Sequence, residues 1–321
     1  MAATASAGAS SADRQGGMFA LETEAHALAD RLPELLLDAI RVASTIAYGT
    51  HGRRRAGPGE TFWQFRQFQS SDAATLIDWR RSASSDHLFV REREWEAAHT
   101  VWLWPDLSPS MNFKSPLAPT TKRDRALVLM LAAAELLVRG GERVGLLGLT
   151  RASASRNATT RLAEALAVNA DGPVLTASLP PQQRLARFTG LLLFSDFLDP
   201  LDAVVARLNE LSAGGVSGHL IQILDPAEET LPYRGRTEFL GLEGDGRWLS
   251  DRAESLRTAY QARLQAHRAG IAEAARRLDW SFLVHHTDRG PAEPLLSLFT
   301  RLQDGMSNYR LSGAASWEGK S

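Results

Sequence analysis

The sequence predicts an α/β protein whose sheet is doubly wound and mostly parallel. Between residues 99 and 304, short apolar runs alternate with longer segments that have helical periodicity. This alternation is typical of a parallel sheet covered by helices on both faces, because each parallel connection needs a crossover that is usually a helix. The chain has 321 residues, of which 44% are hydrophobic, so it can bury a sizeable core.

Composition and periodicity divide the chain into five stretches. They are a disordered tail (1–17), an N-terminal helix (18–50), a small β-rich segment (51–98), the α/β domain (99–304) and a C-terminal tail (305–321). The first tail is rich in Ala, Ser and Gly and lacks the basic region and apolar core of a signal peptide. The N-terminal helix is amphipathic, since its apolar residues recur three and four apart from Leu28 to Ile46.

Within the α/β domain, each element follows from its local pattern. The first strand, 100–104, is an apolar and aromatic run, and the strongly apolar helix 123–139 after it ends at Gly140-Gly141. A continuous apolar run predicts a buried strand at 190–194. The other strands are expected at 143–150, 219–224 and 280–285, and the other helices at 161–168, 201–211, 252–278 and 295–302. In the β-rich segment, 87–96 is expected to be a strand with one solvated face.

Composition excludes several classes of function. The net charge of −1, with both signs interspersed, argues against an extended surface for nucleic acid or an anionic membrane. There are no cysteines, which excludes disulfides, thiolate metal sites and a cysteine nucleophile. No apolar stretch approaches the roughly 20 residues that span a bilayer. We therefore expect a cytoplasmic protein without a membrane span.

The candidate site begins with Asp106-Leu107-Ser108-Pro109-Ser110, directly after the first strand. In open α/β sheets, ligands bind at the carboxyl edge of the strands, where the loops can vary without disturbing the core. One carboxylate and two hydroxyls are hard oxygen ligands that suit Mg²⁺ or Mn²⁺. The structural alternative is that the same side chains cap free backbone N–H groups at a turn.

Two further loops supply residues of the same kind. Asp196 follows the buried strand 190–194, and Thr159 and Thr160 precede a helix. This order resembles the von Willebrand factor A-type domain, a Rossmann-like fold whose metal-ion-dependent adhesion site uses D-x-S-x-S after its first strand, a Thr before a helix and an Asp after a later strand. The resemblance implies that Mg²⁺ or Mn²⁺ is held by Asp106, Ser108, Ser110, Asp196 and either Thr159 or Thr160. For the later residues, a helix-initiating turn is the structural alternative.

A closer resemblance covers nearly the whole chain after Ala20. Its motifs are Gly-Pro-Gly-Glu-Thr-Phe at 57–62, Arg-Gln-Phe at 66–68, Ile-Asp-Trp-Arg at 77–80, Ser-Asp-Phe at 195–197 and the stretch 225–232, which begins Asp-Pro. These motifs are similar to the signature of the bacterial domain of unknown function 58 family. Genes of that family commonly accompany a MoxR-type AAA+ ATPase. The resemblance therefore implies such an ATPase as a partner, together with a client protein that it does not identify.

The resulting hypothesis is a non-enzymatic, metal-dependent adaptor that works with that ATPase. The chain itself has no G-x-x-x-x-G-K-[ST] loop to cradle a phosphate. Two alternatives stand beside this hypothesis. One is a metal-free scaffold with the same fold, in which the Asp106 loop binds its partner by shape and hydrogen bonding. The other is a metal-dependent hydrolase. The chain lacks the G-x-S-x-G motif, which forms the nucleophile elbow of α/β-hydrolases.

Two more groups of polar residues are considered as possible binding sites. Arg66, Asp78, Trp79 and Arg80 either dock a partner or brace the β-rich segment against the α/β domain through aromatic and ion-pair contacts. The pair His285-His286 has no matching Cys or carboxylate pattern, so no zinc site is predicted there.

Overall fold

The computed structural model describes residues 30–47, 62–68, 77–83, 85, 87–93, 99–169, 172–242 and 246–302. The predicted tails 1–17 and 305–321 lie outside the described residues. The chain forms two compact units, one comprising residues 51–98 and the other the rest of the chain. Within the described ranges, no helix combines the length and apolar character that crossing a bilayer requires.

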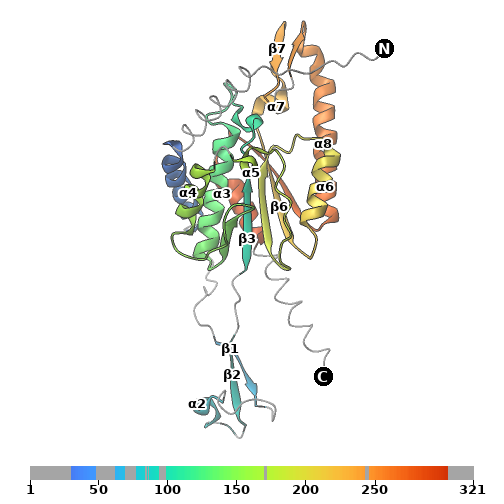
Figure 1. Cartoon of the computed structure of the whole chain (residues 1–321). Coiled ribbons are helices and arrows are strands. Elements are labelled where there is room, and N and C mark those ends of the chain that lie inside the picture. The colour runs from blue at the N-terminus through green and yellow to red at the C-terminus, as the bar shows by residue number, and fades with distance from the viewer. Residues whose placement is uncertain are drawn as a thin grey trace, which may run out of the picture. The chain divides into compact units, whose positions relative to one another are not determined.

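The larger unit is built on a five-stranded sheet in which every neighbouring pair of strands is parallel (Figure 1). In spatial order its strands are β4 (Arg143–Leu146), β3 (Thr100–Pro105), β5 (Gly190–Ser195), β6 (Ser217–Leu224) and β9 (Ser281–His286). The chain leaves β3 toward β4 on one side and later returns to β5 on the other. This reversal places a topological switch point between the carboxyl ends of β3 and β5, which is where open α/β sheets bind ligands.

Helices cover both faces of the sheet, as Figure 1 shows. One hydrophobic cluster joins the sheet to the helix over residues 30–47, to α3 (Lys122–Arg139), to α4 (Ala158–Val168) and to the helix over residues 292–302. A second cluster joins the other face to α6 (Leu201–Leu211) and α8 (Arg257–Arg277). Successive side chains of a strand point to opposite faces, so Leu103 packs in the first cluster and Trp104 in the second. The prediction of a mostly parallel sheet flanked by helices is confirmed.

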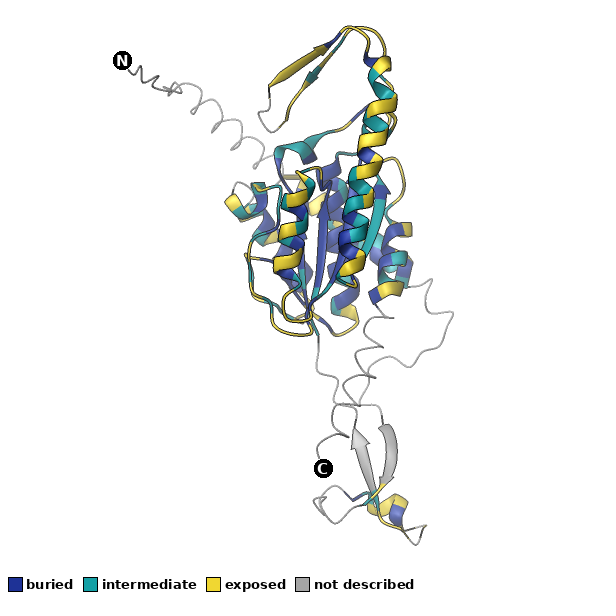
Figure 2. Ribbon diagram, turned by 90° about the vertical axis from the view of Figure 1, so that its right-hand side faces the viewer, coloured by how far each residue is buried: buried dark blue, intermediate teal, exposed yellow. Residues whose placement is uncertain are grey.

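The helix α3 lies at the centre of the first cluster. It is apolar almost all round, and a helix of that kind is buried on several sides. Its start is defined by Thr121, whose hydroxyl accepts a hydrogen bond from the backbone N–H of Asp124 at 3.0 Å. The Asp124 carboxylate in turn accepts from Arg31 of the N-terminal helix at 2.6 Å. In Figure 2 the strands are buried between helices whose outward faces are exposed.

Several short elements were absent from the prediction. They are α5 (Pro173–Thr176), α7 (Pro226–Thr230), the 3₁₀ turns Pro109–Asn112 and Ala253–Leu256, and an antiparallel hairpin of β7 (Thr237–Leu240) and β8 (Arg247–Ser250). The hairpin strands carry no apolar alternation long enough to be recognised locally. Cross-strand stacking stabilises them instead, with the Phe239 and Trp248 ring centroids 5.7 Å apart.

The smaller unit pairs β1 (Phe62–Gln67) with β2 (Phe89–Arg93) in an antiparallel ladder, and it includes a one-turn helix, α2 (Trp79–Ser82). Asp78 caps this helix by accepting from the backbone N–H of Arg81 at 3.0 Å. Ser82 then donates to the Asp78 carbonyl and accepts from the Phe89 N–H. Trp79 is 64% exposed and Arg80 is also exposed, whereas the Arg66 side chain lies outside the described atoms. Partner docking by this group stays a prediction.

Candidate functional site

The candidate site lies at the switch point because the register of β3 and β5 brings two acidic loops together. Pro105 pairs with Phe194, and the Asp106 N–H donates to the Phe194 carbonyl at 2.8 Å. The next residues on the two strands, Asp106 and Ser195, therefore leave the sheet side by side. Asp196 follows one position later, so its carboxylate belongs to the same loop cluster.

Asp106 is completely buried and engages both of its carboxylate oxygens. Oδ1 accepts from the Ser108 backbone N–H at 2.9 Å, and Oδ2 accepts from the Ser195 hydroxyl at 2.6 Å. Burial raises the pKa of Asp106 from 3.8 to about 7, and the nearby charge of Asp196 acts in the same direction. The hydrogen bonds from Ser108 and Ser195 oppose that rise. Asp106 thus holds the start of its loop, as the capping alternative expects, while facing a second carboxylate.

The two serines of the motif connect this loop to Asp196. The Ser108 and Ser110 hydroxyl oxygens lie 3.1 Å apart, and the Ser110 hydroxyl donates to Oδ2 of Asp196 at 3.0 Å. Oδ1 of Asp196 accepts from the Leu198 backbone N–H at 3.1 Å. The structure therefore brings together Asp106, Ser108, Ser110 and Asp196, four of the residues that the sequence assigns to one site.

A lysine that sequence reasoning missed completes this cluster. Lys122 opens α3 and its side chain is only 1% exposed. Its ammonium donates to Oδ2 of Asp196 at 2.8 Å and to Oε1 of Glu228 at 2.6 Å. Burial by itself lowers the pKa of Lys122, but the charges of Asp196 and Glu228 outweigh burial and raise the pKa above its ordinary value. Lys122 is therefore a permanent cation at neutral pH.

One signal for Lys122 was present in the sequence. The first turn of a helix carries a partial positive charge, so a basic residue there is unfavourable unless an anion compensates it. The segment Lys122-Arg123-Asp124-Arg125 places three cations in that turn. For Lys122 the compensating anions, Asp196 and Glu228, come from outside the helix. Glu228 carried its own signal, because Asp-Pro followed by Glu at the third helical position is a capping-box pattern.

The carboxyl end of β6 contributes that capping box. Asp225 begins α7 and accepts from the Ala227 N–H at 2.8 Å, while Glu228 accepts from the Asp225 N–H at 2.8 Å. Asp225 also accepts from both the backbone N–H and the hydroxyl of Ser115, in the loop after β3. Burial raises the pKa of Glu228, against the effect of Lys122. The site thus joins the ends of β3, β5 and β6.

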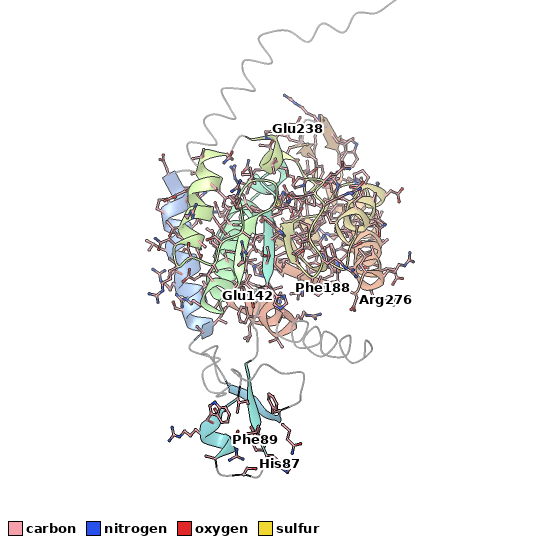
Figure 3. The ribbon with its side chains drawn as sticks, turned by 60° about the horizontal axis from the view of Figure 1, so that its bottom comes forward. His87, Phe89, Glu142, Phe188, Glu238 and Arg276 are labelled. Carbon is pink, nitrogen blue, oxygen red and sulfur yellow. The ribbon has the colours of Figure 1, made fainter. Side chains whose placement is uncertain are left out.

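The sequence predicts either Thr159 or Thr160 as a further ligand, and the structure does not bring Thr159 to these four residues. Thr159 is buried on α4, and its hydroxyl donates to Oε2 of Glu135 at 2.9 Å, whereas Thr160 is exposed. Glu135 lies 13 residues beyond Lys122 on α3, which corresponds to about 20 Å of helix. The chain after β4 folds back, pairing Ser153 with Val144, so α4 begins near the amino edge of the sheet. Glu142, labelled in Figure 3, marks that edge just before β4.

The arrangement of donors does not fit a divalent metal ion. The Ser108 and Ser110 oxygens have about the 3 Å spacing of neighbouring ligands in octahedral Mg²⁺. However, Oδ2 of Asp196 already accepts from Ser110 and from the Lys122 ammonium, which uses both of its lone pairs. In the described part of the chain, no three carboxylate, imidazole or thiol groups are clustered as a metal site. Of the predicted ligands, Asp196 is instead bound directly by an ammonium.

The fold and this cluster define an α/β protein with a buried, charged site at the switch point of a parallel sheet. The chain belongs to the family described as protein of unknown function DUF58, whose sequence profile matches residues 64–270. This confirms the family resemblance predicted from the motifs. The match includes all the strands of the sheet except β9 and every residue of the cluster, from Asp106 to Glu228.

Similar proteins occur in mycobacteria. Uncharacterized proteins of Mycobacterium bovis and Mycobacterium tuberculosis are 27% identical over 292 residues, covering 85% of this chain and 85% of each relative. Among solved structures, the conserved hypothetical protein BatB from Bacteroides thetaiotaomicron aligns with a TM-score of 0.34 and 12% identity, over 64% of this chain and 100% of that chain.

Proposed function

We propose that this chain is a non-catalytic binding protein of the von Willebrand A-like type, which acts as an adaptor between a MoxR-type AAA+ ATPase and a client protein. The observation that carries the proposal is the convergence of Asp106, Ser108, Ser110 and Asp196 at the switch point of the sheet. This is the edge at which open α/β sheets bind ligands. It is also the edge used by the adhesion-type domains that the sequence resembles.

The surface around the cluster supports a protein as the ligand. Two of the loops that leave the carboxyl edge expose a large apolar side chain, with Leu117 52% exposed and Leu198 39% exposed. Asp106, Ser108 and Asp196 lie beneath the surface, whereas Ser110 is partly exposed. An apolar contact beside partly exposed polar groups is typical of protein interfaces. The buried polar groups would hold the loops in shape, and the exposed side chains would contact the partner.

The charges of the site support a non-catalytic role. A hydrolase that used Ser110 as a nucleophile would need a general base to accept the hydroxyl proton. The hydroxyl donates to Asp196, and the same carboxylate oxygen is bound to the Lys122 ammonium. Because the pKa of Lys122 is raised, its side chain holds its proton at neutral pH and cannot act as that base.

Direct binding to the ATPase tests the proposal. Purified chain would be titrated with a MoxR-type ATPase from the same organism, comparing Leu198→Glu with Leu37→Glu, a matched change on the N-terminal helix where Leu37 is 63% exposed. We expect the first change to weaken binding by about tenfold or more and the second to have little effect, since hot spots lie within the contact. Equal affinity of both variants would place the contact elsewhere, and absence of binding by the wild type would refute the ATPase partner.

A further inference from the structure

The buried ammonium of Lys122 binds one of the residues that the sequence predicts to hold a divalent metal ion. It contacts Asp196, the carboxylate assigned as a ligand, and shares the acceptor atom Oδ2 with the Ser110 hydroxyl. A metal ion at ligand distance, about 2.1 Å from that oxygen, would have to displace one of these donors. The second contact of the ammonium, to Glu228 at 2.6 Å, holds it in place from the side of β6.

The composition of the chain supports a specific use of lysine here. Of the 36 Lys and Arg residues, only Lys114, Lys122 and Lys320 are lysines. The chain therefore relies on arginine for its other positive charges, including most of its ion pairs. Lysine offers a compact, rotatable point charge, whereas the planar guanidinium group of arginine is larger and has fixed donor directions. A cation that fits between the buried Asp196 and the partly buried Glu228 is better supplied by the smaller group.

Burial and charge explain why the cluster needs a cation at all. Asp106, Asp196 and Glu228 are three carboxyl groups from three strand ends, and Asp106 and Asp196 are almost fully buried. Unpaired charges of this kind are strongly unfavourable in a protein interior. Lys122 is the cation that contacts two of the three.

We propose that Lys122 is the resident cation of this site, which takes the place of a divalent metal ion and makes the arrangement of the Asp106 and Asp196 loops independent of metal. This deepens the proposed function and rests on it in one respect, because it implies that partner docking at this edge needs no Mg²⁺. The cation requirement itself concerns folding of the isolated chain. It can therefore be tested without a partner.

The test compares thermal unfolding in EDTA and in millimolar Mg²⁺ for four proteins: the wild type, Lys122→Met, the double variant Lys122→Met with Asp196→Asn, and Lys114→Met. Lys114 is exposed and serves as the matched control. Calorimetric titration of the wild type with Mg²⁺ and Mn²⁺ accompanies these measurements, and it does not depend on whether any variant folds.

We expect the wild type and Lys114→Met to melt at the same temperature in both buffers, with no saturable heat of metal binding. Lys122→Met should melt roughly 10 °C lower in EDTA, because two carboxylates lose their cation, and Mg²⁺ should restore part of that loss. The double variant should not respond to Mg²⁺, since it lacks the Asp196 charge.

Three results would overturn the proposal. They are saturable binding of one metal ion by the wild type, unchanged stability of Lys122→Met, and a destabilised Lys122→Met that Mg²⁺ does not rescue. If Lys122→Met does not fold in either buffer, the wild-type titration decides. None of these measurements involves the ATPase, so a failure here is distinct from failure of the adaptor proposal, which the ATPase titration alone decides.

Discussion

Lys122 and Asp196 form a buried ion pair at 2.8 Å although they are 74 positions apart in the chain. The pair joins the first residue of α3 to the loop that follows β5, across the switch point of the sheet. A buried pair is not by itself a large source of stability, because both charges lose their hydration. Removing one partner nevertheless costs about 3–5 kcal/mol, since the other charge then stays buried without compensation. The pair therefore disfavours any arrangement of these loops in which Lys122 and Asp196 are separated.

Asp106 gives a first prediction about pH. Its pKa is about 7 in the folded chain and 3.8 ordinarily, so the folded state binds this proton more tightly than the unfolded state does. The corresponding stability is present below pH 3.8 and is lost as the pH rises toward 7. Asp106→Asn resembles the protonated form and does not lose this stability. Between pH 3.8 and 7, its free energy of unfolding should therefore rise relative to that of the wild type by up to about 1.4 kcal/mol per pH unit. Urea unfolding between pH 5 and 8 measures the difference, and a difference that does not change with pH would contradict it.

His285 gives a second prediction with the opposite sign. It is buried at the end of β9, and burial, with Arg125 nearby, lowers its pKa from 6.5 to about 3. The folded chain thus resists a proton that the unfolded chain accepts. The contribution of His285 to the free energy of unfolding is fully present above pH 6.5. It falls by about 1.4 kcal/mol per pH unit as the pH decreases toward 3. The slope for His285→Leu between pH 5 and 6.5 should be smaller by about that amount, and equal slopes for the two proteins would refute the assignment.

Asp225 gives a third prediction, about the connection between strand ends. Its buried carboxylate accepts from Ser115 and from the N–H of Ala227, so Asp225→Ala leaves several donors without partners. We expect the free energy of unfolding to fall by about 3 kcal/mol, and by about 1 kcal/mol in Ser115→Ala. Thr230→Ala, at an exposed position of the same short helix, is the control and should change it by less than about 0.5 kcal/mol. Denaturant titration measures all three, and a Thr230→Ala effect as large as that of Asp225→Ala would count against the connection.

Gly218 gives a fourth prediction, about packing on the second face of the sheet. A Cβ added there would lie 2.1 Å from the indole ring of Trp280, whose Nε1–H donates to the Val216 carbonyl at 2.8 Å. Gly218→Ala should therefore displace the indole and lower stability by about 1–3 kcal/mol. The matched change Gly290→Ala meets nothing within 4 Å and should be close to neutral. Unfolding experiments would measure both effects, and similar stabilities for the two variants would show that the indole does not pack on Gly218.

The local pattern of the sequence predicted much of the fold. The helix Leu201–Leu211 has the bounds expected from its periodicity, and β5 ends one residue beyond its predicted end. Asp106 and Asp196 were found for the same reason, because each directly follows a strand and parallel strands share a carboxyl edge. Thr159 was misplaced because the chain after β4 reverses direction through a bridge that no local pattern indicates.

What the sequence by itself determined is where strands and helices form and which loops leave the carboxyl edge, because periodicity and apolar runs depend on residues that are neighbours in the chain. Only the tertiary structure decided which charge meets Asp196. The partners of Lys122 lie 74 and 106 positions away, at the ends of two different strands. Electrostatic pairing depends on distance in space and on burial, and the packing of α3 against the sheet determines both.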